Sequence, residues 1–184
     1  MRRIALPGLI TLIAAALLAL LAFGVANDGT NSSLDAEVTS GHFPVAPTAH
    51  MSLPLLSSRG SESLASLRGH VVMVSFFAGW CDGCQADAGV VASAERRLQK
   101  AGGTVIGVTY DDSSSDALSY MHHYHLKFPV LHDANGSLAS AYGVDGVPET
   151  FIINAQGKVV ALRRYQLVQA WMNRTLDRVL ANAA

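Results

Sequence analysis

The sequence predicts an α/β domain whose mixed central sheet is flanked by helices on both faces. Short apolar runs rich in β-branched and aromatic residues alternate with longer segments of helical period, which is typical of strand–helix units. The alternation ends with two strands joined by a turn at residues 154–157, followed by a terminal helix. The only two cysteines, Cys81 and Cys84, stand where the first long apolar strand passes into a helix.

The apolar periodicity changes between strand and helix spacing several times after residue 51. Glycines such as the Gly102-Gly103 pair end the periodic segments. Together these signals predict a short strand at 53–56, a helical turn at 63–69, a strand at 70–77, a helix at 82–101, a strand at 104–110, a helix at 114–124, a strand at 128–131, a helix at 137–142, strands at 150–153 and 159–163, and a helix at 167–180.

Residues 1–26 are predicted to anchor the chain in a membrane. Arg2 and Arg3 precede about 23 residues without a charge, enough to cross a bilayer. The two arginines predict that the amino terminus stays cytoplasmic and that the remainder is exported. Small residues at 24–26 also fit a signal-peptidase site, so a cleaved signal peptide is the alternative.

Two further segments complete the predicted organisation. Residues 27–50 carry Asn, Ser, Thr, Gly and Pro without sustained periodicity, and we interpret them as a flexible tether. Residues 51–184 are predicted to form the globular domain.

Charge and cysteine content restrict the possible functions. The formal net charge is −1, and it becomes −3 without Arg2 and Arg3. No stretch interleaves basic and aromatic residues, so nucleic acid is not an expected partner. Two cysteines in an exported chain favour a catalytic pair over a disulfide scaffold. They cannot by themselves complete a zinc site, which usually takes four ligands, and we predict no metal and no other cofactor.

The motif Trp80-Cys81-Asp82-Gly83-Cys84 predicts thiol–disulfide exchange. A strand that delivers Cys-x-x-Cys to the start of a helix is the thioredoxin arrangement. Helical N–H groups and the helix dipole favour a thiolate on Cys81, and Cys84 is close enough to resolve a mixed disulfide. We expect Trp80 to shield Cys81 and to help partners dock. Asp82 opposes the Cys81 thiolate by charge repulsion, which favours a reducing pair.

Pro148 leads into the strand at 150–153, and in a thioredoxin fold this loop faces the cysteine pair. We predict a cis Val147–Pro148 bond, which would leave the Val147 backbone free to pair with a substrate strand. The alternative is an ordinary turn with a trans proline.

Two acids are candidates to carry the proton of the Cys84 thiol. Asp87 lies one helical turn after Cys84, and burial would raise its pKa toward the working range. The alternative for Asp87 is a solvated acid on the helix surface. Glu149 is the second candidate because it adjoins Pro148, and it too has the alternative of a solvated surface acid.

Four histidines lie close together in the sequence, and they leave two other functions to consider. His122 and His125 have the spacing of one helix face, which would permit metal binding, although solvated surface histidines are more common. A copper-delivery protein of thioredoxin fold would use a wider Cys-x-x-x-Cys pair with a distal histidine, so only His132 keeps that alternative open. A peroxiredoxin would need Thr where this chain has Ala78. The four are His122, His123, His125 and His132.

Two segments resemble the membrane-tethered ResA/TlpA/CcmG thioredoxin-like proteins. They are Leu-Arg-Gly-His-Val-Val-Met-Val-Ser-Phe-Phe-Ala-Gly-Trp-Cys at 67–81 and Gly-Val-Asp-Gly-Val-Pro-Glu-Thr-Phe-Ile-Ile-Asn at 143–154. The Gly-x-Pro-Glu-Thr-Phe form most resembles the CcmG branch, also called DsbE. The resemblance covers about residues 51–181.

This resemblance implies a single-pass protein of the bacterial cell membrane whose catalytic domain lies outside the cytoplasm. It implies a reductase of apocytochrome c, or of another exported thiol protein, during cytochrome c maturation. It also implies a membrane thiol carrier of the CcdA or DsbD kind as electron donor. Carried over to this chain, Cys81 is the nucleophile, Cys84 the resolving thiol and Pro148 the cis-proline. Asp87 stands where relatives usually have Glu, and Glu149 matches the acid after the cis-proline.

The chain departs from these relatives at two places. Asp82-Gly83 replaces a proline often found between the cysteines, and Gly89 stands where a proline commonly kinks the helix. Both departures leave the reduction potential open, and an extracytoplasmic protein-disulfide oxidase is the alternative function.

Overall fold

The computed structural model describes residues 12–19 and 32–182, in two compact units that divide between residues 30 and 31. In the first unit residues 12–19 are helical, and the rest of the predicted anchor lies outside the described residues. Within the two described ranges, no helix combines the length and the apolar character needed to cross a membrane.

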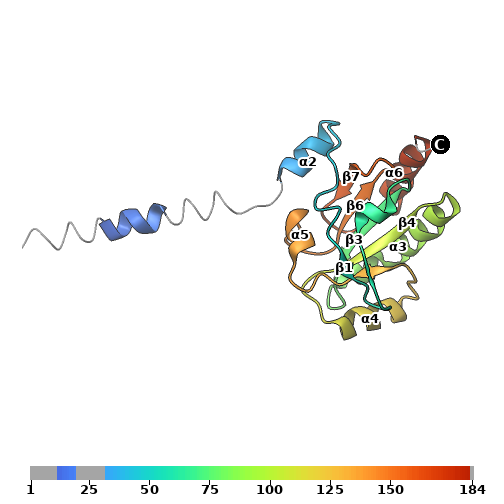
Figure 1. Ribbon diagram of the computed structural model, residues 1–184, viewed down its shortest axis with the longest axis horizontal. Coiled ribbons are helices and arrows are strands. Elements are labelled where there is room, and N and C mark those ends of the chain that lie inside the picture. The colour runs from blue at the N-terminus through green and yellow to red at the C-terminus, as the bar shows by residue number, and fades with distance from the viewer. Residues whose placement is uncertain (1–11, 20–31, 183–184) are drawn as a thin grey trace, which may run out of the picture. The chain divides into compact units, whose positions relative to one another are not determined.

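The second unit is built on a five-stranded mixed sheet in the order β5-β4-β3-β6-β7 (Figure 1). The first three strands of this order are mutually parallel, whereas β6 is antiparallel to β3 and β7 to β6. Every residue of the central strand β3 is buried, because the strand has a neighbour on each side and helices over each face. The strands are β3 (Val72–Phe77), β4 (Thr104–Thr109), β5 (Val130–Leu131), β6 (Glu149–Ile153) and β7 (Val159–Arg163).

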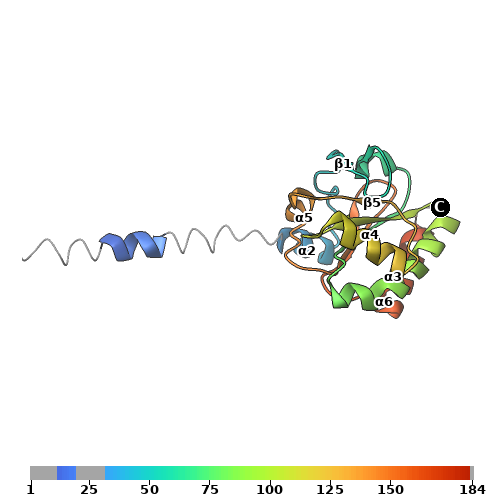
Figure 2. The same ribbon diagram turned by 90° about the horizontal axis from the view of Figure 1, so that it is seen from below.

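Helices cover both faces of this sheet, as predicted. One face carries α3 (Asp82–Lys100), α4 (Ser114–His123) and α6 (Gln169–Ala181). Of these, α3 and α6 lie next to each other (Figure 2). The fold class is therefore confirmed, and so is the order of elements after residue 51 except for a two-residue strand, β2 (Ser61–Glu62), that was not predicted.

The opposite face is covered by shorter elements. They are α2 (Ser32–Thr39), the 3₁₀ helix η1 (Leu64–Leu67) and α5 (Ser137–Ala141). A small antiparallel hairpin of β1 (Leu53–Pro54) and β2 (Ser61–Glu62) precedes η1. Successive strand residues point to opposite faces, so the sheet separates two apolar clusters, one under α3, α4 and α6 and the other under α2 and α5.

The predicted flexible tether over residues 27–50 is wrong for residues 32–50. Leu34 of α2 is buried with Ala46 and Ala49 in the cluster that also contains α5. The few apolar residues of this polar stretch are irregularly spaced, and their burial depends on a surface supplied by distant strands. The domain therefore begins near residue 31, and residues 27–31 lie outside the described part of the chain.

Arg164, just after β7, binds three other segments of the chain on this face of the sheet. Its Nη1 lies 2.5 Å from Glu149 Oε2, and its Nη2 lies 2.6 Å from Asp35 Oδ2 on α2. Nη1 also donates to the carbonyl oxygens of Tyr142 and Gly143, each at 3.1 Å. Burial raises the pKa of Glu149 to about 7, although the guanidinium acts in the opposite direction. A single cation therefore compensates a carboxylate that is almost fully buried.

Replacing Arg164 with Leu should destabilise the domain strongly. The change leaves Glu149 buried without a cation, and we expect the free energy of unfolding at about pH 8 to fall by about 3–5 kcal/mol. The loss should be smaller at about pH 5, because Glu149, with a pKa raised to about 7, then holds a proton and needs no counter-charge. Chemical denaturation at the two pH values measures both quantities.

Arg174→Leu is the matched control, because Arg174 is an exposed arginine of α6. It should change the free energy of unfolding by no more than about 0.5 kcal/mol. Equal losses for the two variants would contradict the role given to Arg164.

Candidate active site

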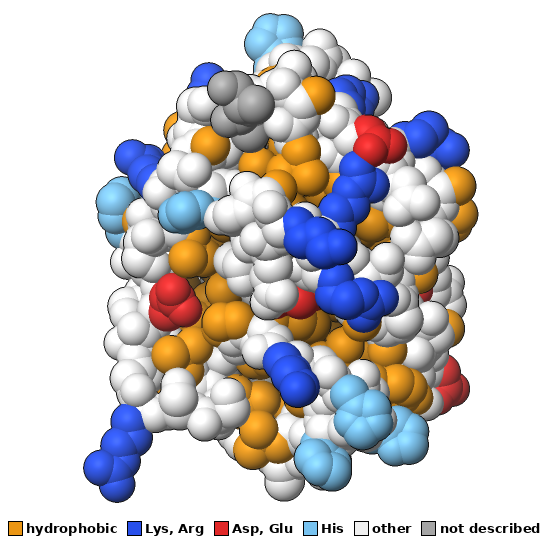
Figure 3. Space-filling view, turned by 90° about the vertical axis from the view of Figure 1, so that its right-hand side faces the viewer, with side chains coloured by type: hydrophobic (Ala, Val, Ile, Leu, Met, Phe, Trp, Pro, Cys, Tyr) orange, Lys and Arg blue, Asp and Glu red, His pale blue; other side chains and the backbone are white. Residues whose placement is uncertain are grey.

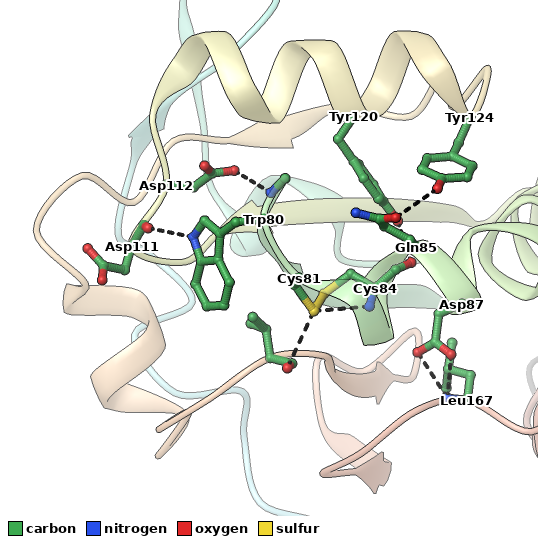
Figure 4. The surroundings of a disulfide bond; sticks show 12 residues. Trp80, Cys81, Cys84, Gln85, Asp87, Asp111, Asp112, Tyr120, Tyr124 and Leu167 are labelled. Atoms are coloured by element: carbon green, nitrogen blue, oxygen red, sulfur yellow. Dashed lines mark hydrogen bonds between the residues drawn. A yellow bond between two sulfur atoms is a disulfide. The ribbon is translucent and has the colours of Figure 1, made fainter.

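The cysteine pair lies at the amino-terminal end of α3, where the predicted strand-to-helix junction places it. Cys81 is the N-cap residue of α3, and its Sγ accepts a hydrogen bond from the backbone N–H of Cys84 at 3.0 Å. The two cysteines form a disulfide with a Cα–Cα separation of 5.2 Å (Figure 4). The same N–H and the amino end of the helix favour negative charge on the Cys81 sulfur once the disulfide is reduced.

The loop before β6 meets this pair, and its Val147–Pro148 peptide bond is cis, as predicted. The carbonyl oxygen of Val147 lies 3.5 Å from Cys81 Sγ. At the other end of the motif, a Cβ atom added to Gly83 would lie 3.0 Å from Pro148 Cδ and 3.1 Å from Gln166 Nε2. The loop therefore lies against both ends of the Cys-x-x-Cys segment, and a side chain at position 83 would require Pro148 or Gln166 to shift by a few tenths of an ångström.

Trp80 projects beside the pair and is largely exposed. Its side chain is 57% exposed, and its indole Nε1 donates to the carbonyl oxygen of Asp111 at 3.0 Å. The preceding turn is fixed by a second bond, in which the Gly79 N–H donates to Asp112 Oδ2 at 2.7 Å. The indole is thus held in one place while its ring remains open to a partner.

Asp87 is buried next to the pair, so the alternative of a solvated acid is excluded. It lies on the same buried face of α3 as Cys84, and it is only 4% exposed. Both of its carboxylate oxygens accept the backbone N–H of Leu167 at 2.9 Å. Burial raises the pKa of Asp87 to about 6, against the lowering effects of the Leu167 hydrogen bond and of Arg163. An acid with this pKa can exchange protons near neutral pH.

Glu149 is held on the other side of the sheet. It pairs with Phe76 in the β3–β6 register, and it shares a sheet face with Phe151 in the cluster under α5. Its carboxylate binds Arg164 there. The sheet therefore lies between the two carboxylates that are candidates to carry the proton of the Cys84 thiol. Only Asp87 lies on the face covered by α3.

The histidines do not share one helix face. His122 and His123 lie in the last turn of α4, but His125 follows the helix with a φ of 54°. The shared helix face that the spacing of His122 and His125 would permit is therefore not formed, because the helix ends between them. His132 Nδ1 lies 3.2 Å from Thr109 Oγ1. Across the described residues, no three His, Cys, Asp or Glu side chains are grouped in a way that could hold a metal ion.

Several neighbours of the pair gave no signal in the sequence. The Tyr120 hydroxyl donates to the carbonyl oxygen of Cys84 at 2.7 Å, from a helix 36 residues further on. From the segment before α6, the Leu167 backbone N–H reaches Asp87 and the Gln166 side chain lies beside Gly83. Each of these neighbours comes from a segment far along the chain, and the Leu167 N–H is a backbone group that is independent of residue type, so local sequence patterns did not identify them.

Comparison with known proteins agrees with this geometry. The chain is 31% identical to the thiol-disulfide oxidoreductase ResA of Bacillus subtilis (strain 168) over 97 residues, which are 53% of this chain and 54% of that protein. It is 30% identical to the thiol:disulfide interchange protein DsbE of Pseudomonas fluorescens biotype C over 114 residues, which are 61% and 62% of the two chains. The alignments thus span little more than half the length of these relatives.

The fold and the family are shown by two further matches. A thiol:disulfide interchange protein of the thioredoxin family from Chlorobium tepidum TLS superposes with a TM-score of 0.66 at 25% identity, over 75% of this chain and 97% of that one. Residues 46–162 match the AhpC/TSA family. Because this match covers well over half of the sequence, the chain belongs to the AhpC/TSA family.

Proposed function

We propose that this protein is a thiol-disulfide oxidoreductase in which Cys81 attacks and Cys84 resolves. The observation that supports this most directly is the Cys81–Cys84 disulfide at the amino end of α3, in contact with the cis-proline loop. The names of the ResA and DsbE relatives are consistent with it.

The exchange proceeds in two steps from the reduced protein. The Cys81 thiolate attacks a substrate disulfide, forms a mixed disulfide and releases the first substrate thiolate. Cys84 then loses its proton and attacks the Cys81 sulfur, which releases the second substrate thiolate and forms the Cys81–Cys84 disulfide. The substrate gains two electrons and the protein loses two, so a dithiol donor must reduce the pair before the next cycle.

Asp87 is the group that accepts the Cys84 proton in this scheme. It is buried on the helix face of Cys84, and its pKa of about 6 leaves it mostly ionised at neutral pH and therefore able to accept a proton. Glu149 is less suited, because its carboxylate bonds Arg164 on the opposite face of the sheet.

We further propose that the protein works outside the cytoplasm in the reducing direction. Exported thiol proteins such as apocytochrome c would be its substrates, a membrane carrier of the CcdA or DsbD kind its donor, and residues 1–26 its attachment to the membrane. Asp82 supports the reducing direction, because a carboxylate beside Cys81 disfavours a thiolate there. A reduction potential well above that of glutathione would instead assign the protein as an oxidase.

Replacing Cys84 with Ser should trap a mixed disulfide through Cys81. The variant can complete the first step but has no second thiol to release the partner. We expect a covalent adduct with a disulfide-containing peptide, visible on a non-reducing gel and located at Cys81 by mass spectrometry. Cys81→Ser is the control and should form no adduct. Adducts with neither variant would contradict the proposed activity.

The Asp87→Asn variant should lose one limb of the pH–rate profile. In the native protein, reduction of a peptide disulfide should accelerate as pH rises through about 6, because Asp87 becomes a base there. The variant should be slower and should lack this rise. Glu149→Gln serves as the comparison and should retain it. Loss of the rise in Glu149→Gln alone would transfer the proton role to Glu149.

The same Asp87→Asn variant should be more stable than the native protein at neutral pH. The pKa of Asp87 in the folded state, about 6, lies above the unfolded value of 3.8, so the folded protein loses stability as pH rises through this interval. Asn does not titrate and can still accept the Leu167 N–H. The stability advantage of the variant should therefore grow by about 2 kcal/mol between about pH 4 and pH 8. An advantage that is independent of pH, measured by denaturation, would show that Asp87 is not strained by its burial.

A further inference from the structure

We propose that the groove between α3 and α4 binds a positively charged segment of the substrate protein, close in sequence to the disulfide that is reduced. This inference rests on the proposed oxidoreductase activity and specifies the class of substrate. The groove is separate from the cis-proline loop, which approaches the cysteine pair through Val147 and Pro148.

The groove begins at Trp80 and continues along α4. Its volume is about 570 Å³, within the range of functional binding sites. Figure 4 shows α4 above the cysteine pair, with Tyr120 and Tyr124 pointing down toward Gln85 of α3. The side chains that matter for recognition are Trp80, Gln85, Asp116, Ser119 and Tyr124.

The walls of the groove are held in place before any partner arrives. The rings of Tyr120 and Tyr124 are 5.0 Å apart, and the Tyr124 hydroxyl donates to Gln85 Oε1 at 3.3 Å. A Cβ atom on Gly79 would lie 2.7 Å from the backbone oxygen of Asp116, so glycine allows α4 to approach the cysteine loop this closely. A groove with fixed walls loses little conformational entropy when a ligand binds.

The charge of the groove selects a cationic ligand. Asp116 is exposed within it, and Asp111 and Asp112 flank Trp80. No Lys or Arg occurs in residues 69–95 or 101–126, the two stretches that supply the lining described by the structure. Among the lining residues that the structure describes there is thus no Lys or Arg, and the one basic side chain is that of His123.

The basic residues lie elsewhere on the domain. Figure 3 shows a face on which Lys and Arg side chains gather, over α6 and the carboxyl-terminal half of α3. Because the Lys and Arg side chains lie on that face and the carboxylates lie around Trp80, the electrostatic field directs a positively charged partner toward the Trp80 end of α3. The basic residues of α3 and α6 are Arg96, Arg97, Lys100, Arg174 and Arg178.

Aromatic rings and carboxylates together favour Lys or Arg over a neutral apolar side chain. The exposed indole of Trp80 presents a ring face to which a cation is attracted, and Asp116 adds an ion pair. Trp80 immediately precedes Cys81, so a substrate bonded to the Cys81 sulfur passes close to the groove. At roughly 3.3 Å per extended residue, a side chain about three or four residues from the substrate cysteine reaches it.

The test compares three peptides that share one intramolecular disulfide and differ only in residues near it. These flanking residues are Lys in the first peptide, Gln in the second and Glu in the third. With the reduced full-length protein at low ionic strength, we expect kcat/KM for the Lys peptide to exceed that for the Gln peptide about five-fold and that for the Glu peptide by more. The difference should lie mainly in KM and should shrink in about 0.5 M NaCl.

Asp116→Asn locates this preference in the groove. It should reduce the ratio of kcat/KM for the Lys peptide to kcat/KM for the Gln peptide about two- to three-fold. Glu37→Gln, an equal loss of charge at an exposed position of α2, should leave the advantage unchanged. α2 contacts β7, at the opposite edge of the sheet from β5.

The possible outcomes separate this inference from the function on which it rests. Equal kcat/KM for the three peptides, or a Lys preference that Asp116→Asn and Glu37→Gln alter equally, would overturn the cationic groove and leave the oxidoreductase activity standing. A faster reaction with the Gln peptide than with the Lys peptide would also overturn it, because the groove would then bind neutral segments. Failure to reduce any of the peptides would instead count against the oxidoreductase activity itself.

Discussion

The antiparallel pairing of β3 with β6 is the constraint on which the site depends. Its register sets Phe76 opposite Glu149, so the carboxyl end of β3 and the amino end of β6 lie side by side at the same end of the strands. The chain leaving β3 carries Cys81, and the chain entering β6 carries Pro148, so the two loops meet. The 3.5 Å contact between Cys81 Sγ and the Val147 carbonyl oxygen follows from this pairing, although 66 residues separate the two.

The same sheet divides the buried charges of the domain. Asp87 lies on the face covered by α3 and α6, with only a backbone N–H as its hydrogen-bond donor among the described residues. Glu149 lies on the other face, where Arg164 neutralises it and also binds Asp35 of α2. One carboxylate thus has a raised pKa without an ion pair and is suited to exchange a proton. Glu149, through its ion pair with Arg164, links α2 to β6, the strand that follows the cis-proline.

The cysteine pair lies between the cis-proline loop and the groove at α4, and we expect these two surfaces to contribute differently to substrate binding. On one side, the cis-proline loop presents the Val147 backbone carbonyl, which we expect to bind extended polypeptide without regard to its side chains. On the other side, α4 and Trp80 form a groove of aromatic rings and carboxylates, which can distinguish one flanking sequence from another. Affinity for disulfide-bonded chains in general and preference among them would then come from different parts of the domain.

The sequence by itself determined the order of elements after residue 51 apart from β2, the position of Cys81 at a helix start and the cis-proline loop. These features depend on local signals: apolar periodicity, glycine stops and a motif contained in a few adjacent residues. The helical turn at η1 and the long helix α3 were predictable for the same reason. The burial of Asp87 was predictable in part, since helical spacing placed it beside Cys84.

Only the tertiary structure decided the features that depend on distant partners. Residues 32–50 are polar and irregular, yet Leu34, Ala46 and Ala49 are buried against strands far along the chain. His122 and His125 have helical spacing, but α4 ends between them. Glu149 adjoins Pro148 in sequence, but the alternation of side chains along β6 turns it to the face opposite α3. For residues 32–50 and for Glu149 the deciding interaction is a contact between segments far apart in sequence, which local periodicity cannot encode.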